Sequence, residues 1–291
     1  MLYTCNNNQL YIEVDSLGAG LMSLRDLHGT EYLWQGDPKY WKGRSPILFP
    51  IVGALRNGQA VIDGQAYAMP RHGLARINSF RKIESGADSL TFRLDANAET
   101  RKAYPFDFSL EVCFALRDRT LTERFMVVNR DSRPMPFCLG CHPGFNIPLE
   151  EGEALSDYTL RFAEKESCDS PRIDPETDLI LEEDRRPVLE ESDTLPLSHE
   201  MFYKDALVLE GLRSRSVTLS SAVSCRGIRM DFDGFDYFGI WQAKDAPFLC
   251  LEPWTGTATT DREGDDFAKK RGMTLLSPGE EREYILKITL L

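Results

Sequence analysis

The sequence predicts an all-β fold, built as a large antiparallel sandwich or barrel with few short helices. Apolar residues recur at every second position, most clearly from Phe106 to Leu116, which is the period of a strand with one buried face. Asp63-Gly64 stands between two short apolar stretches, and this dipeptide is a strong signal for a two-residue hairpin. Many such strands with turn residues between them are typical of antiparallel sandwiches and barrels.

The predicted strands follow one another along almost the whole chain. Arg117-Asp118-Arg119 turns the Phe106–Leu116 strand back into a partner at Leu121–Asn129. The hairpin at Asp63-Gly64 joins Gln59–Ile62 to Gln65–Ala68. The other predicted strands are Leu10–Val14, Gly20–Arg25, Phe80–Glu84, Leu90–Leu94, Tyr158–Phe162, Ala206–Leu209, Ser216–Leu219, Gly227–Phe232, Gly239–Gln242, Phe248–Leu251 and Glu283–Leu290.

Helical turns are expected at only two places, Asp37–Trp41 and Asp265–Lys269. The least regular stretch is Ser167–Asp193, which is acidic and interrupted by prolines, so we expect a long surface excursion with a strand or two. No linker with a shift in composition divides the chain. We therefore expect residues 1–291 to form a single β-sandwich domain.

The composition is that of an ordinary globular protein, with 42% hydrophobic and 27% charged residues and a net charge of -12. A field of that sign repels nucleic acids and anionic membranes, so neither is an expected partner. No stretch approaches the roughly 18 continuous apolar residues of a membrane helix. Residues 1–8 lack the basic start and apolar core of a signal peptide, so we expect a cytoplasmic protein, as a monomer or homodimer.

Cys138-Leu139-Gly140-Cys141-His142 matches the C-x-x-C-H pattern that attaches haem in c-type cytochromes. Pro136 and Pro143 disfavour a helix on either side, and a cytoplasmic location does not fit haem attachment. Zinc is also disfavoured, because no second C-x-x-C or histidine pair completes a ligand set. An odd number of cysteines, seven in all, is expected to be reduced. His142 then stays a candidate either for catalysis or for a buried structural histidine.

The stretch "FLCLEPW", residues 248–254, carries the best candidate for a general base. Strand alternation puts Glu252 on the face shared by Phe248 and Cys250, and partial burial there raises the pKa of a carboxyl toward a useful range. The alternative is that Glu252 begins a loop and is solvated.

The stretch "PRHGLAR", residues 70–76, places His72 between Arg71 and Arg76. Such a density of cationic groups beside Gly73 is unusual for a core, although a basic loop edge is an equally simple reading. The other two histidines, His28 and His199, are expected in a surface turn and beside a short helix at the surface.

Further polar candidates lie at the ends of apolar stretches. Arg44 and Arg56 bound "RSPILFPIVGALRNG", and an arginine fork can hold two adjacent hydroxyl groups. Asp205 directly precedes the strand Ala206–Leu209.

The order of "ILFPIVG", "RHGLAR", "CHPGF", "KDALVL", "FDYFGIW" and "LEPW" resembles that of the aldose 1-epimerase (galactose mutarotase) family, and most of all its shorter bacterial branch. The resemblance covers nearly the whole chain. It implies a galactose mutarotase-like supersandwich that binds a small-molecule sugar in its concave face, with no cofactor and no metal ion.

The resemblance also implies roles for individual residues. His142 matches the general acid, Glu252 the general base and His72 a second histidine near the sugar ring. Asp205 matches a substrate-binding aspartate. The substrate arginine is expected to be Arg56, with Arg76 as the second choice, because this chain has an alanine where relatives often have a basic residue after "PIVG".

An epimerase of this kind interconverts the α and β anomers of a free hexose by opening and reclosing its ring. One carboxylate removes the O1 proton and one imidazole protonates O5, on opposite sides of the C1–O5 bond. The alternatives are a hexose-6-phosphate 1-epimerase with a clamp from Arg71 or Arg76, a non-catalytic carbohydrate-binding protein, and a polysaccharide hydrolase or lyase. A hydrolase normally needs two carboxylates, and only Glu252 is a strong candidate.

Overall fold

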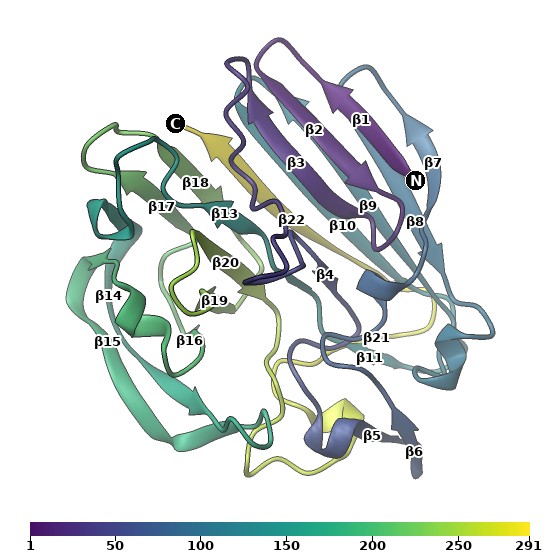
Figure 1. Ribbon diagram of the computed structural model, residues 1–291. Helices are drawn as coiled ribbons and strands as arrows, with labels where there is room; N and C mark the ends of the chain where they lie inside the picture. The colour runs from purple at the N-terminus through teal and green to yellow at the C-terminus, as the bar shows by residue number, and fades with distance from the viewer.

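The computed structural model of the protein describes residues 1–291 as two layers of antiparallel sheet (Figure 1). One nine-stranded sheet forms the back layer, and two smaller sheets lie in front of its two halves. The predicted class, an all-β antiparallel sandwich with few short helices, is confirmed. None of the helices has the length and apolar composition needed to cross a membrane.

The back sheet contains the hairpin predicted from the clearest alternating segment, and its strands pair without a register shift there. In spatial order its strands are β15 (Ile180–Pro196), β14 (Tyr158–Ile173), β17 (Ser216–Ser221), β18 (Gly227–Asp231), β22 (Glu281–Leu290), β10 (Thr120–Asn129), β9 (Phe108–Arg117), β8 (Ser89–Asp95) and β7 (Arg81–Ser85).

The front layer consists of a three-stranded sheet over one half of the back sheet and a six-stranded sheet over the other (Figure 1). The first contains β1 (Leu2–Asn6), β2 (Leu10–Asp15) and β3 (Gly20–Asp26). The second runs in the order β16 (Leu207–Glu210), β19 (Tyr237–Trp241), β20 (Phe248–Trp254), β12 (Gly140–Cys141) and β4 (Ile47–Leu48), with β13 (Gly144–Asn146) also paired to β20.

Two short ribbons and six single-turn 3-10 helices complete the structure. The ribbons pair β5 (Gln59–Ile62) with β6 (Gln65–Ala68), and β11 (Met135–Phe137) with β21 (Thr274–Leu276). The helices are Arg56–Gly58, Ala75–Ile77, Thr100–Lys102, Leu155–Asp157, His199–Phe202 and Phe267–Lys269. Both expected helical turns are present, since Trp41 N–H donates to the Asp37 carbonyl and the last helix lies within Asp265–Lys269.

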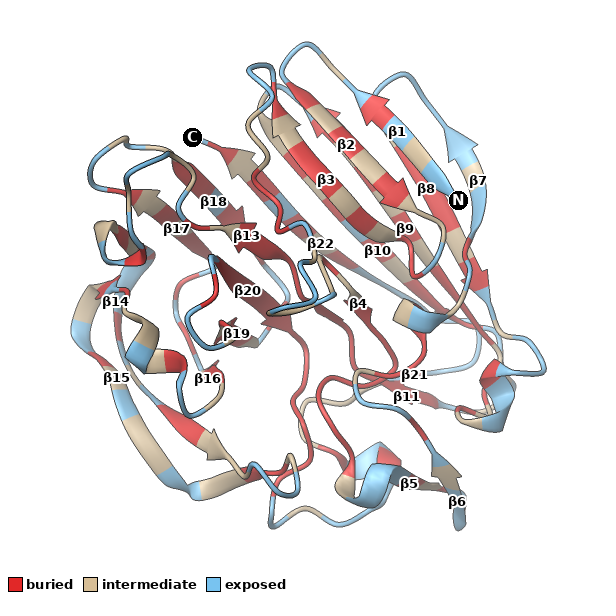
Figure 2. Ribbon diagram, in the orientation of Figure 1, coloured by how far each residue is buried: buried red, intermediate tan, exposed pale blue.

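The core fills the space between the layers. Tyr3 on β1 meets Phe92 on β8 edge to face at 5.4 Å, and Phe232, just after β18, packs 4.7 Å from Phe238 on β19. Buried residues alternate with more exposed ones along most strands, whereas β20 is buried over its whole length (Figure 2). The six-stranded sheet is therefore covered on both faces, and its outer face must have a second cover.

That second cover includes a long hairpin of the back sheet, in the stretch where a long surface excursion with a strand or two was expected. The stretch 167–193 consists mainly of the end of β14 and most of β15, which pair with each other. Beyond the predicted strand Tyr158–Phe162, their pairing contains several register shifts and most of their residues are half-exposed or exposed, so no period-two pattern marks this part in the sequence. The Ser170 hydroxyl accepts from Val208 N–H at 2.8 Å and ties this arm to β16.

We expect Gly73→Ala to destabilise the protein far more than Gly64→Ala. Both glycines have positive φ, +72° and +78°, so both substitutions carry a strain of about 1–2 kcal/mol. An added Cβ would meet nothing within 4 Å at Gly64, but would lie 2.3 Å from the Phe49 carbonyl oxygen at Gly73. Urea unfolding should show a loss of roughly 3 kcal/mol or more for Gly73→Ala. Equal losses for the two variants would contradict this reading of the contact.

Candidate active site

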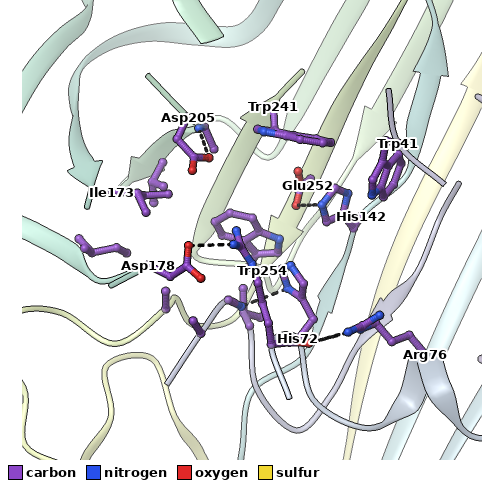
Figure 3. Close-up of a pocket in the computed structure, with 18 residues that line it drawn as sticks. Trp41, His72, Arg76, His142, Ile173, Asp178, Asp205, Trp241, Glu252 and Trp254 are labelled. Atoms are coloured by element: carbon purple, nitrogen blue, oxygen red, sulfur yellow. Dashed lines mark hydrogen bonds and ion pairs between the residues drawn. The ribbon is translucent and has the colours of Figure 1, made fainter. Parts of the chain in front are cut away.

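An open cleft of about 370 Å³ lies on the outer face of the six-stranded sheet, beneath the β14–β15 arm (Figure 3). Strands β16, β19 and β20 and His142, directly after β12, supply its floor, and loops around residues 41, 53 and 72 supply one wall. Ile173 and Ile180, at the two ends of the arm's turn, line the other side. Residues from eight separate parts of the chain therefore converge on one concavity.

Glu252 lies at the bottom of this cleft and is 2% exposed. Strand β20 extends past the predicted end at Leu251, so that Glu252 is held within the sheet opposite Gly239 of β19. Leu249 and Leu251 belong to the main core, while Glu252 faces the cleft, as the alternation predicts. The alternative of a solvated loop carboxylate is excluded.

His142 directly follows β12 and reaches the same point of the floor. Its backbone N–H donates to the Pro46 carbonyl at 3.2 Å, and its ring stacks on Trp41 with 4.8 Å between ring centres. The ring lies between aromatic side chains, since Trp241 meets it edge-on at 5.8 Å. The C-x-x-C-H cysteines do not join it, because Cys138 and Cys141 are buried in two different apolar clusters.

His142 and Glu252 are in direct contact, with 3.2 Å between Nε2 and Oε2 (Figure 3). Burial raises the pKa of Glu252 well above its usual range and lowers the pKa of His142, because each charged form loses hydration. Two groups in such contact titrate as a unit. Near neutral pH the pair is therefore expected to hold one proton, and both pKa directions favour it on Glu252, hydrogen-bonded to a neutral His142.

His72 stands beside this pair, with its ring 5.6 Å from that of His142. The Gly53 N–H donates to His72 Nδ1 at 3.2 Å, so Nδ1 is an acceptor and the neutral ring carries its proton on Nε2. Burial first, and the nearby His142 second, lower the pKa of His72 well below its usual value. His72 is thus a neutral imidazole with one N–H to offer.

The floor of the cleft is aromatic. Trp254 lies across its neighbours in the sheet, because Gly239 and Gly140 leave room for it: a Cβ on either glycine would lie within 2.5 or 2.7 Å of the indole. Its Nε1 is buried without a hydrogen-bond partner, and so is Nδ1 of His142. Buried polar atoms without a partner are uncommon in folded proteins, and here two of them lie on residues that line the cleft.

Charged side chains surround the rim. Arg71 forms an ion pair with Asp178 of the arm at 3.1 Å, and both side chains remain nearly half-exposed. Arg76 lines the cleft, but its guanidinium donates only to the Arg71 carbonyl and meets no carboxylate. Asp205 lines the opposite side. Its φ of 75° is a strained conformation for a residue other than glycine, and such strain is often found at functional sites.

Arg56 does not reach the cleft, and the prediction that it holds the substrate there was wrong. Its guanidinium instead donates to the carbonyls of Glu263, Thr260 and Asp261 and pairs with Asp265 at 3.3 Å. These contacts fasten the loop after β20 to the start of β5. Of the two expected arginines, only Arg76 lines the cleft.

Several cleft residues were not predicted from the sequence. Trp41, Trp241, Trp254 and Asp178 all line the cleft. Trp241 and Trp254 belong to two motifs that carried the resemblance, FDYFGIW and LEPW, and this could have indicated that they lie near Glu252. Nothing local marks Trp41 or Asp178, which come from a turn and from the tip of the arm.

This fold and site define a class: a β-sandwich with a buried carboxyl–imidazole pair at the bottom of an aromatic cleft. The family model described as Aldose 1-epimerase matches residues 1–289. The chain therefore belongs to the aldose 1-epimerase family.

Individual relatives cover the whole chain. The chromosomal protein LacX of Lactococcus lactis subsp. lactis is 40% identical over 298 residues, which span 100% of both sequences. The X-ray structure of a galactose mutarotase related enzyme from Lactobacillus acidophilus has a TM-score of 0.94 at 32% identity, covering 100% of this chain and 97% of that one. A galactose mutarotase-like protein from Lactobacillus casei has a TM-score of 0.91 at 31% identity, with complete coverage of both.

The raised pKa of Glu252 predicts that Glu252→Gln stabilises the protein at alkaline pH. A carboxyl whose folded pKa is raised binds its proton more tightly in the folded state, so it lowers stability as pH rises above the unfolded value of 4.5. Each unit of the shift corresponds to about 1.4 kcal/mol. Urea unfolding at pH 8 should therefore give a higher free energy for the variant than for wild type, and the difference should shrink toward pH 4. A variant less stable than wild type at pH 8 would contradict the assigned burial.

Proposed function

We propose that the protein is an aldose 1-epimerase that interconverts the α and β anomers of a free hexose by acid–base ring opening and reclosure. The contact between His142 and Glu252 at the bottom of the cleft carries this proposal. Membership of the aldose 1-epimerase family supports it, and so does the similarity to the two mutarotase-like proteins from Lactobacillus. The name of the LacX relatives states no reaction.

The reaction needs one group to take a proton and another to give one. Glu252 accepts the proton of the anomeric hydroxyl O1, while His142 donates its proton to the ring oxygen O5, and the C1–O5 bond breaks. Rotation about C1–C2 then presents the other face of the aldehyde, and ring closure returns both protons. O1 and O5 are bonded to the same carbon, so two groups in contact with each other can reach both.

The shared proton suits the reversal of this cycle. Burial favours the proton on Glu252 in the free protein, so in this proposal it passes to His142 when the sugar binds. With the proton on His142 and none on Glu252, the pair can open a ring; after opening, the proton that left O1 lies on Glu252. Closure on either face restores the starting state, so the pair needs no external acid or base between turnovers. The low-dielectric floor strengthens each of these hydrogen bonds relative to water.

The other cleft residues suit the binding of a polyhydroxylated ring. Trp254 and Trp241 offer flat apolar surfaces for its C–H faces. The expected Nε2–H of His72, the free N–H groups of Arg76 and the carboxylate of Asp205 can each bond hydroxyl groups. In this proposal these residues orient the sugar, and His142 and Glu252 carry out the chemistry.

Loss of either member of the pair should abolish most activity. We expect His142→Asn and Glu252→Gln to lower kcat for mutarotation by about 10²- to 10⁴-fold, because each removes one proton transfer. Polarimetry of freshly dissolved α-D-glucose and α-D-galactose measures this directly, with circular dichroism to show that the variants are folded. His199→Asn is a matched control, since that imidazole bonds Gln242 outside the cleft.

Full activity in both pair variants would sink the assignment. If wild-type protein accelerates neither sugar nor a phosphorylated hexose, the proposal fails and a non-catalytic carbohydrate-binding protein becomes the better reading. Calorimetric titration of the same sugars into wild type would then test that reading.

One observation favours a second candidate, a hexose-6-phosphate 1-epimerase. Arg76 faces the cleft without a carboxylate partner, and Arg71 stands next to it. An unpaired guanidinium beside a sugar site is suited to a phosphate dianion, which it can bind through two parallel hydrogen bonds. The same pair, His142 and Glu252, would then act on the phosphorylated sugar.

Arg76→Gln separates the two candidates. If the substrate carries a phosphate, the variant should lower the ratio of kcat/KM for glucose 6-phosphate to that for glucose by about tenfold or more, the effect of one lost charged hydrogen bond. The measurement is mutarotation of both sugars with wild type and variant. An unchanged ratio, together with faster turnover of the free sugar, would eliminate the phosphorylated substrate.

A further inference from the structure

A cysteine lies behind the acid–base pair and takes no part in the proposed reaction. Cys250 is a free thiol, fully buried, two residues before Glu252 on β20 and on the same face of that strand. One ligand-forming atom each from Cys250, Glu252 and His142 lie within 4.8 Å of one another. This is the one group of three such side chains in the molecule that is so close together.

We propose that Cys250, His142 and Glu252 form a binding site for a thiophilic divalent cation such as Zn²⁺, and that the bound ion blocks the acid–base pair. Thiolate, imidazole and carboxylate are the three ligand types that zinc takes in proteins. The proposal that an ion binds rests on the three side chains alone. The proposal that the ion inhibits the protein rests also on the proposed function of the His142–Glu252 pair.

The geometry suits a tetrahedral ion open to the cleft. Bonds of about 2.0–2.3 Å to nitrogen, oxygen and sulfur place ligand atoms roughly 3–4 Å apart, so side-chain atoms that lie within 4.8 Å of one another need to close up by at most about 1–2 Å. His142 and Glu252 line the cleft, whereas Cys250 does not. An ion entering from the cleft would first contact His142 and Glu252 and would then bind the Cys250 thiolate, which lies deeper. Its fourth coordination position would face the cleft, where solvent or a sugar can bind.

Binding removes the protons on which the reaction depends. The Cys250 thiol must ionise, although burial and the adjacent Glu252 raise its pKa, and the proton shared by His142 and Glu252 must leave as well. About two protons are therefore released for each ion bound. With both the imidazole and the carboxylate coordinated, neither can exchange a proton with O1 or O5.

Cobalt(II) tests the site independently of activity, because a thiolate ligand gives Co²⁺ an intense near-ultraviolet charge-transfer band. The titration uses the full chain with Cys225→Ser, which removes the one exposed thiol. Cys250→Ala removes the proposed ligand. Cys141→Ala is the matched control, since that buried thiol also lies beside His142 but packs into the main core.

We expect one Co²⁺ per chain with the thiolate band, displaced by Zn²⁺, in the parent and in Cys141→Ala. The band should be absent from Cys250→Ala, and affinity should fall by at least about 10- to 100-fold, the effect of losing even an indirect metal contact. No thiolate band in the parent, or a band that persists in Cys250→Ala, would overturn the site. If circular dichroism shows Cys250→Ala unfolded, the isosteric Cys250→Ser is used, and the same two results decide.

Zinc inhibition tests the functional half of the proposal. Micromolar Zn²⁺ should slow mutarotation in the parent, a chelator should restore it, and Cys250→Ala should resist the same concentration by tenfold or more. Equal inhibition of the parent and Cys250→Ala would overturn the blocking. A protein that shows the thiolate band but never accelerates mutarotation would retain the metal site and lose the proposed function, so the two failures are distinguishable.

Discussion

Much of this fold serves to bury one carboxyl group, that of Glu252. Glu252 lies in a strand buried along its entire length, where an isolated carboxylate would be strongly disfavoured. Its contact with His142 at 3.2 Å provides the hydrogen bond and the proton that make this burial tolerable. The stacked Trp41 covers one face of the His142 ring. Much of the surrounding structure can be understood as the support for this single contact.

The layers of the sandwich provide that support. Strand β20 is paired on one side with β19 and on the other with β12 and β13, so the backbone around Glu252 cannot shift without breaking sheet hydrogen bonds. Glycines on the neighbouring strands let Trp254 lie flat beside the carboxyl. Beneath, the core side chains of the two layers interdigitate and fix the position of the floor. Rigid strands position the reacting groups here, and loops supply only the walls.

Period-two alternation was enough to predict the fold class and most of the strands, because half-buried strands leave that pattern in the sequence. It missed the greater part of the two longest strands, β14 beyond Phe162 and β15, whose half-exposed course has no single buried face. Alternation also put Glu252 on the cleft side of its strand. It could not place Arg56, since that guanidinium bonds carbonyls about 200 residues away in the chain, and such partners are set by tertiary structure alone. Trp41 escaped notice for the same reason: its stacking on His142 joins two loops distant in sequence.

The arm has a consequence for how such a protein can diversify. The His142–Glu252 pair belongs to the paired interior of a sheet, whereas Ile173, Asp178 and Ile180 belong to a hairpin whose outer strand is at the edge of its sheet. Insertions, deletions and charge reversals are tolerated at such a tip far better than in a central strand. Changes in the arm can therefore alter the shape and charge of the cleft entrance while the contact between His142 and Glu252 stays as it is. In this architecture the entrance and the floor of the cleft can vary independently of each other.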